Sequence, residues 1–94
     1  MNTKILLNYF CFLEENAPKK NVILTPGWIG IALFKRTGFI QYVDPNAQES
    51  IVDLNFHWAL TKLDGQTYDY DLYLEKRDGE RHFEAEFTKY TVNN

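Results

Sequence analysis

The chain has little of several residue types that mark common classes of protein. Its single cysteine, Cys11, excludes an internal disulfide and a zinc site built from cysteines, and it suits a reducing compartment. No run of about 18 apolar residues occurs, so we expect no membrane-spanning helix. Gly27, Gly30 and Gly38 lack the spacing of a phosphate-binding loop, and the H-E-x-x-H metal motif is missing. We therefore expect no cofactor and no resident metal.

What the chain does contain is enough for one hydrophobic core. Its 94 residues are 45% hydrophobic and 16% aromatic, which predicts a single domain over residues 1–94. The net charge of −3 is unevenly distributed, with +3 over residues 1–43 and −7 over residues 44–86. A nucleic-acid-binding domain usually carries a basic stripe, so we expect no nucleic-acid partner.

The N-terminal segment reads as a helix over residues 3–15. Leu6, Leu7, Phe10 and Leu13 fall on one helical stripe, although the segment is apolar on most sides and a strand is the alternative. A secretory signal peptide is a second alternative, because a lysine precedes the apolar stretch. Two glutamates follow that stretch directly and no small-residue cleavage site is evident, so we expect a cytoplasmic protein.

The pattern then becomes that of β-strands. Val22–Thr25 is a short strand that Pro26-Gly27 ends with a type II turn. Trp28–Phe34 and Phe39–Val43 flank a predicted hairpin turn at 35–38. We interpret Trp28–Phe34 as a central strand buried on both faces, in which Gly30 allows another element to approach closely. Its aromatic residues could alternatively line a ligand pocket.

A polar loop over residues 44–50 precedes three further predicted strands, at about 51–62, 67–76 and 81–91. Short turns usually join neighbouring strands, so a largely sequential strand order is expected. The predicted fold class is α+β, with the N-terminal helix packed on a five- or six-stranded antiparallel β-meander.

Two Asp-Gly pairs fix the register of the last three strands. Asp78-Gly79 is a two-residue hairpin signal that pairs Leu74 with Phe83 and Leu72 with Ala85 on a core face. A two-residue loop at Asp64-Gly65 would instead oppose tryptophan and leucine to aspartates. We therefore predict a three-residue loop, Leu63-Asp64-Gly65, with Gly65 in a left-handed bulge.

This register places an unusual number of acidic side chains on the other face of the sheet. Asp71 falls opposite Glu86, and like charges in that position cost a few tenths to about 1 kcal/mol. A solvated outer surface is one explanation, and a docking surface for a basic partner is the other. The docking hypothesis assigns partner binding to Asp69, Asp71, Tyr73, Glu75, His82, Glu84 and Glu86.

Two chemical alternatives use the same face. A divalent metal could be held by His57, Asp71 and Glu86, or by a second set composed of Asp53, Glu75 and His82. A catalytic pair would need Cys11 to meet a histidine, but a lone cysteine among apolar residues is usually buried and inert. We therefore predict a protein that is not an enzyme.

In size, acidity and expected sheet architecture the chain resembles the small bacterial immunity proteins that neutralise toxin domains. The resemblance is one of general character and includes no motif. It implies a basic partner, such as a toxin nuclease, whose active-site cleft is covered by the acidic face with Tyr73 as an anchor. The alternative function is a small structural or assembly domain that associates with itself through a sheet edge or the N-terminal helix.

Overall fold

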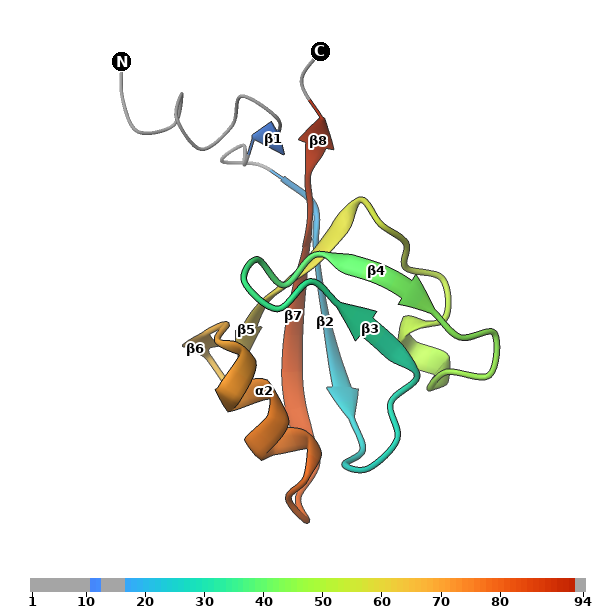
Figure 1. Cartoon of the computed structure of the whole chain (residues 1–94), viewed down its shortest axis with the longest axis vertical. Coiled ribbons are helices and arrows are strands. Elements are labelled where there is room, and N and C mark those ends of the chain that lie inside the picture. Colours follow the sequence, from blue (N-terminus) through green and yellow to red (C-terminus); the bar gives the residue numbers. More distant parts are fainter. Residues whose placement is uncertain (1–10, 13–16, 93–94) are drawn as a thin grey trace.

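The largest element of this protein is a four-stranded antiparallel sheet. We describe it from a computed structural model, which covers residues 11–12 and 17–92. The sheet has the order β2-β7-β5-β6 and is formed by β2 (Lys19–Leu24), β7 (Phe83–Lys89), β5 (Trp58–Leu63) and β6 (Gln66–Thr67). β7 is therefore inserted between strands that are distant in sequence (Figure 1).

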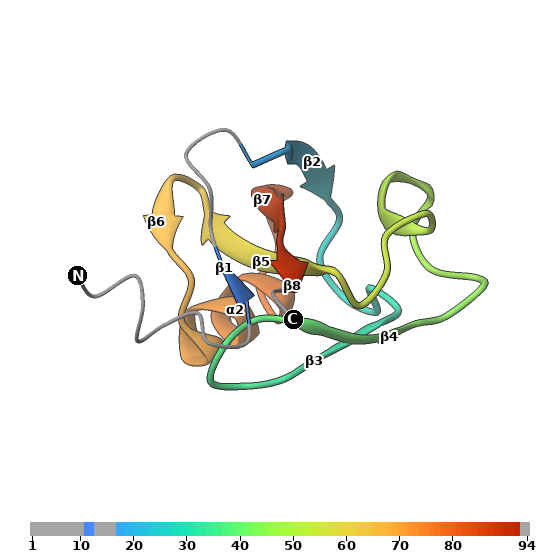
Figure 2. The same cartoon turned by 90° about the horizontal axis from the view of Figure 1, so that it is seen from above.

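A hairpin and one helix cover the same face of this sheet. The hairpin consists of β3 (Ile31–Leu33) and β4 (Ile40–Val43), and the helix is α2 (Tyr70–Arg77). Seen from above, both lie on one side of the layer formed by β2, β7 and β5 (Figure 2). The short 3₁₀ helix η1 (Glu49–Ile51) lies in the connection from β4 to β5, and β1 (Cys11–Phe12) pairs with β8 (Thr91–Val92).

The core lies between the sheet and this cover. Side chains alternate along β7, so Phe83, Ala85 and Phe87 are buried while Glu84 and Glu86 face away from the core. The predicted alternation of buried and exposed residues along this strand is confirmed, but the predicted pairing of Phe83 and Ala85 with Leu74 and Leu72 is wrong, because β7 pairs with β2 and β5. Leu33 and Ile40 of the hairpin and Tyr73 of the helix belong to the same buried cluster, together with residues of β2, β5 and the segment around η1.

The predicted fold class is wrong. The described residues are mostly sheet, with one short helix late in the chain. Most of the helix expected at 3–15 lies outside the described residues, and Cys11–Phe12 within it is the strand β1. The helix in the described part of the chain occupies the segment predicted as the strand at 67–76. Strand order is not sequential either, because β7 separates β2 from β5.

Local chemistry explains why Tyr70–Arg77 is a helix. The carboxylate of Asp69 caps it by accepting a hydrogen bond from the backbone N–H of Leu72 at 3.3 Å. An acid in the first turn, Asp71, and bases in the last turn complement the helix dipole. Asp78 is the C-cap residue, so Asp78-Gly79 ends a helix and does not form the hairpin that we predicted.

The Asp64-Gly65 turn also differs from the prediction. Asp64 (φ 49°) and Gly65 (φ 81°) both have positive φ, and Leu63 pairs with Gln66, which is a two-residue hairpin of type I′. We expected a three-residue loop because a shorter one would oppose Trp58 to an aspartate. That conflict never arises, since β6 ends at Thr67.

The first half of the described chain is closer to expectation. Pro26-Gly27 turns the chain after β2, with Gly27 at φ 100°, and the hairpin around residues 35–38 is confirmed. Trp28–Phe34 is not doubly buried, however, because Trp28 is 64% exposed. The close approach at Gly30 is confirmed: a Cβ there would lie 2.8 Å from the Cα of Ala47.

Candidate protein-binding surface

The seven residues predicted to bind a partner do not form one face. Glu84 and Glu86 lie on the open side of β7, opposite the side that α2 covers (Figure 2). Asp69 caps α2, Asp71 and Glu75 lie exposed on it, and His82 is in the segment before β7. Tyr73 is only 4% exposed, because helical periodicity turns it into the core. The single acidic sheet face therefore does not exist.

On the open side of the sheet, the two glutamates have mixed neighbours. Glu86 pairs across the strands with Asn21 of β2 and Lys62 of β5, and Glu84 pairs with Ile23. A bulge at Thr61 directs its hydroxyl to Glu86, where it donates to Oε2 at 2.8 Å. This face therefore has a nearby positive charge and an apolar neighbour in place of a continuous acidic patch.

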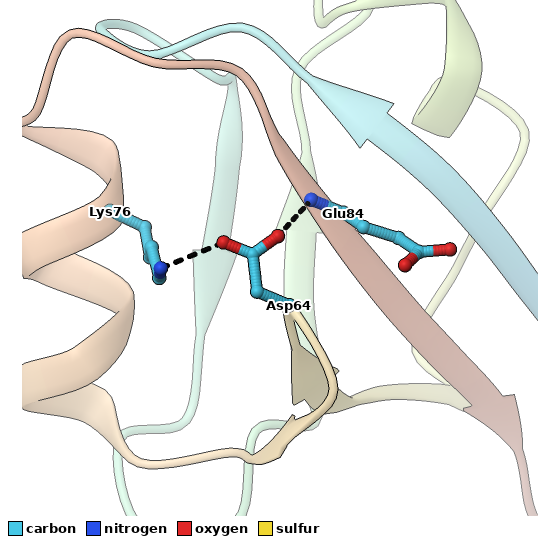
Figure 3. Close-up of polar contacts among 3 residues, drawn as sticks. All are labelled: Asp64, Lys76 and Glu84. Atoms are coloured by element: carbon cyan, nitrogen blue, oxygen red, sulfur yellow. Dashed lines mark hydrogen bonds and ion pairs between the residues drawn. The ribbon is translucent and has the colours of Figure 1, made fainter.

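Asp64 has a structural role at the edge of the sheet (Figure 3). Its backbone N–H donates to the carbonyl of Glu84 at 2.8 Å, and its Oδ1 accepts from the backbone N–H of Glu84 at 2.8 Å. Its Oδ2 is 2.7 Å from Nζ of Lys76 on α2. The carboxylate thus joins the β5–β6 turn, β7 and the helix, and the ion pair with Lys76, helped by the Glu84 N–H, lowers the pKa of Asp64.

The most distinctive exposed residues are aromatic and lie on or beside the β3–β4 hairpin. Trp28 is 64% exposed, Tyr42 58% and Phe34 52%. Leu33 and Ile40 pair with each other and face the core, whereas Tyr42 pairs with Ala32 on the outer side. We call Trp28, Phe34 and Tyr42 the aromatic surface.

A hollow of about 440 Å³ opens between the aromatic surface and the C-terminal end of α2. Trp28, Ala32 and Tyr42 line it from the hairpin side, and Tyr73 and Arg77 from the helix. Burial raises the pKa of Tyr73 to about 12, so this phenol stays neutral near pH 7. Two carboxylates, Asp44 and Asp78, complete the charged part of the lining.

Several contacts hold the walls of this hollow in place. The backbone N–H of Gly27 donates to the carbonyl of Arg77 at 2.8 Å, which joins the loop before β3 to the helix. The N–H of Asp44 donates to the carbonyl of Gly30 at 2.8 Å. The side chain of Gln48 accepts from the N–H of Thr25 at 2.9 Å and donates to its carbonyl at 2.8 Å.

The sequence reasoning missed this surface because it treated Trp28–Phe34 as buried on both sides. The residues at 28, 30, 32 and 34 alternate with Ile29, Ile31 and Leu33, which is the signal of a strand with one exposed face. Two aromatic residues on the exposed side could have suggested a binding surface.

The structure can also be compared with the proposed metal sites and with the expectation about membrane-spanning helices. Within residues 11–12 and 17–92, no group of three or more His, Cys, Asp and Glu side chains is placed to hold a metal ion. Asp53, a member of one proposed set, instead pairs with Lys20 at 2.9 Å, and this contact lowers its pKa. No helix in the same part of the chain is long and apolar enough to cross a membrane.

Comparison with known proteins gives no match: no family model, curated protein or solved structure matches this chain.

Proposed function

We propose that this chain is a non-enzymatic protein-binding inhibitor whose main contact surface is the aromatic surface of the β3–β4 hairpin. The observation that carries the proposal is the exposure of Trp28, Phe34 and Tyr42, each at least half exposed, on or beside one hairpin. Each ring leaves more than half of its surface outside the core, and Trp and Tyr are enriched among the residues that dominate binding energy at interfaces.

The hairpin is well suited to present these rings because it is firmly attached to the sheet. The N–H of Leu60 donates to the carbonyl of Gly38 at 2.8 Å, and Phe39 forms a bridge with Ala59 of β5. At the turn, the hydroxyl of Tyr68 donates to the carbonyl of Lys35 at 2.9 Å. A surface held in its binding conformation loses less entropy on association.

The charge of the chain supports a basic partner. The net charge is −3, and the acids that we expected on one face are instead distributed over α2, β7 and the loops. A net negative charge favours diffusional encounter with a basic protein, while the apolar contacts set how long the complex lasts. Within this class, we propose a cytoplasmic immunity-type inhibitor of a toxin domain with a basic cleft.

The experiment is a pull-down from the source cell with three purified variants. Trp28→Ala and Tyr42→Ala each remove a ring of the aromatic surface, and Phe56→Ala is the matched control, because Phe56 is 65% exposed and lies outside this surface. We expect one basic protein, identified by mass spectrometry, with the wild type and Phe56→Ala, and a loss of at least tenfold with the other two.

Two results would contradict the proposal. If Trp28→Ala and Tyr42→Ala retain the partner as well as the wild type does, the aromatic surface is not the contact. If the wild-type chain recovers only itself and sedimentation shows oligomers at micromolar concentration, the alternative of a self-associating assembly domain is favoured.

A further inference from the structure

The hollow beside the aromatic surface contains more chemistry than a general apolar contact needs. Its outer walls are the rings of Trp28 and Tyr42, both more than half exposed. The lining also has two carboxylates and one guanidinium. A flat apolar contact would not require these charged groups, so their sign indicates the charge of the group that the hollow binds.

The charges do not cancel. The charge of Arg77 is paired with that of Asp78, because Nε of Arg77 donates to Oδ1 of Asp78 at 3.0 Å. Asp44 accepts a hydrogen bond from the backbone N–H of Asn46 at 2.8 Å, and no cation among the described residues forms an ion pair with it. The lining therefore has one uncompensated negative charge beside two electron-rich rings.

We propose that this hollow receives an arginine side chain of the partner protein. This inference rests on the proposed function and names the chemistry of its central contact. A cation is favoured over an anion because the rings and Asp44 both attract positive charge. Arginine fits better than lysine because its planar guanidinium stacks on an aromatic face and forms paired hydrogen bonds with a carboxylate.

The size of the hollow agrees with this occupant. At about 440 Å³ it lies in the range of about 300–1,000 Å³ that is typical of ligand sites, so one long side chain and part of its backbone can enter. Gly27 and Gly30 lie on its lining, so their backbone amides report on an occupant. An arginine beside tryptophan and tyrosine rings is also the kind of anchor that dominates many interfaces.

The test uses two capped tripeptides, Gly-Arg-Gly and Gly-citrulline-Gly, which have nearly the same shape but differ in charge. Each is titrated into the full-length, ¹⁵N-labelled protein, and the indole N–H of Trp28 and the amides of Gly27 and Gly30 are followed by NMR. We expect saturable shifts at these three groups with the arginine peptide. The citrulline peptide should bind about 3- to 30-fold more weakly, which corresponds to a cation–π and ion-pair contribution of this kind.

A pair of conservative variants completes the experiment. Asp44→Asn removes the charge but keeps an oxygen for the N–H of Asn46, and Asp71→Asn is the control because it removes an exposed charge from α2, outside the hollow. The arginine peptide should bind Asp44→Asn about 3- to 10-fold more weakly and Asp71→Asn as it binds the wild type.

Several results would overturn the arginine assignment: equal affinity for the two peptides, an absence of saturable shifts, shifts centred on Glu84 and Glu86, or equal effects of the two variants. Stronger binding of a capped proline tripeptide at the same amides would overturn it too and indicate a proline-rich segment. These results leave the proposed function standing if Trp28→Ala still abolishes capture in the pull-down. Failure of that pull-down, in contrast, counts against the binding surface itself.

Discussion

The contacts of Asp64 allow a quantitative test of how the helix is joined to the sheet. In a continuing strand, the backbone carbonyl at position 64 would accept a hydrogen bond from the N–H of Glu84. Here the turn begins at residue 64, with φ 49°, and the side-chain Oδ1 accepts that bond at 2.8 Å. The second oxygen pairs with Lys76 at 2.7 Å. Asp64 therefore makes two contacts, a hydrogen bond through Oδ1 and an ion pair through Oδ2, and different substitutions can separate them.

Asp64→Ala removes both contacts and leaves a residue that tolerates positive φ poorly. A hydrogen bond to a charged acceptor contributes about 1.5–3 kcal/mol, and the partly exposed ion pair adds less than about 1 kcal/mol. We expect a loss of about 2–3 kcal/mol, or about 10–20 °C in Tm for a domain of this size. Asp64→Asn keeps an oxygen acceptor and the tolerance of positive φ, so it should lose only about 0.5–1 kcal/mol.

Urea unfolding followed by circular dichroism measures both variants, with Glu80→Ala as an exposed control expected to lie within about 0.5 kcal/mol of the wild type. Because the pKa of Asp64 is lowered in the folded protein, its contribution is complete above the ordinary aspartate pKa of about 3.9 and is lost as the pH falls through the folded value. The difference between wild type and Asp64→Asn should therefore shrink in acid. Equal losses for the Asn and Ala variants would refute the assignment of a hydrogen-bond role to Oδ1.

Two further predictions follow from the same structure. Gly30→Ala should destabilise the protein by about 2–4 kcal/mol, because residue 30 has φ 90° and its Cβ would collide with the backbone of Ala47. The control Gly27→Ala should cost only about 1–2 kcal/mol in the same urea assay, because residue 27 also has positive φ (100°) but its Cβ would meet nothing within 4 Å. Similar losses would contradict the close approach. Burial raises the pKa values of Tyr68 and Tyr73 to about 12. The free energy of unfolding should therefore fall as the pH rises from about 10 to 12. In an absorbance titration of phenolate formation, Tyr73→Phe should remove part of the increase that occurs near pH 12. An unchanged late titration in Tyr73→Phe would exclude Tyr73 as its source.

Some of the fold follows from local pattern alone. The alternation Phe83-Glu84-Ala85-Glu86-Phe87 fits only a strand with one buried face, and the structure has that strand. Pro26-Gly27 requires a turn with positive φ at glycine, and residue 27 has it. These features were predictable because each depends on residues that are neighbours in the sequence.

The segment from Asp69 to Asp78 misled the prediction because it satisfies two periods at once. Tyr70, Leu72 and Leu74 alternate as a strand would, while Tyr70, Tyr73, Leu74 and Arg77 recur as a helix would. The helix signals were present: Asp69 at the N-cap, an acid in the first turn and two bases in the last turn. An eight-residue helix covers just over two turns, so its helical periodicity is a weak signal. The apparent hairpin signal at Asp78-Gly79 was stronger and favoured a strand.

That single assignment also decided which surface seemed functional. A strand at 67–76 sends Tyr73 and the acids of this segment outward beside Glu84 and Glu86, and so creates an acidic face. A helix buries Tyr73, leaves Asp71 and Glu75 exposed on α2 and not on the sheet, and places Arg77 beside the hairpin. Tyr73, Arg77 and Asp78 then line the helix side of the hollow, where Arg77 is paired with Asp78 and no cation of the described residues is paired with Asp44. In our proposal, negative charge still takes part in partner recognition, but it is the single carboxylate of Asp44 beside the rings of Trp28 and Tyr42. Stacking on a ring and one ion pair then act on the same arginine of the partner.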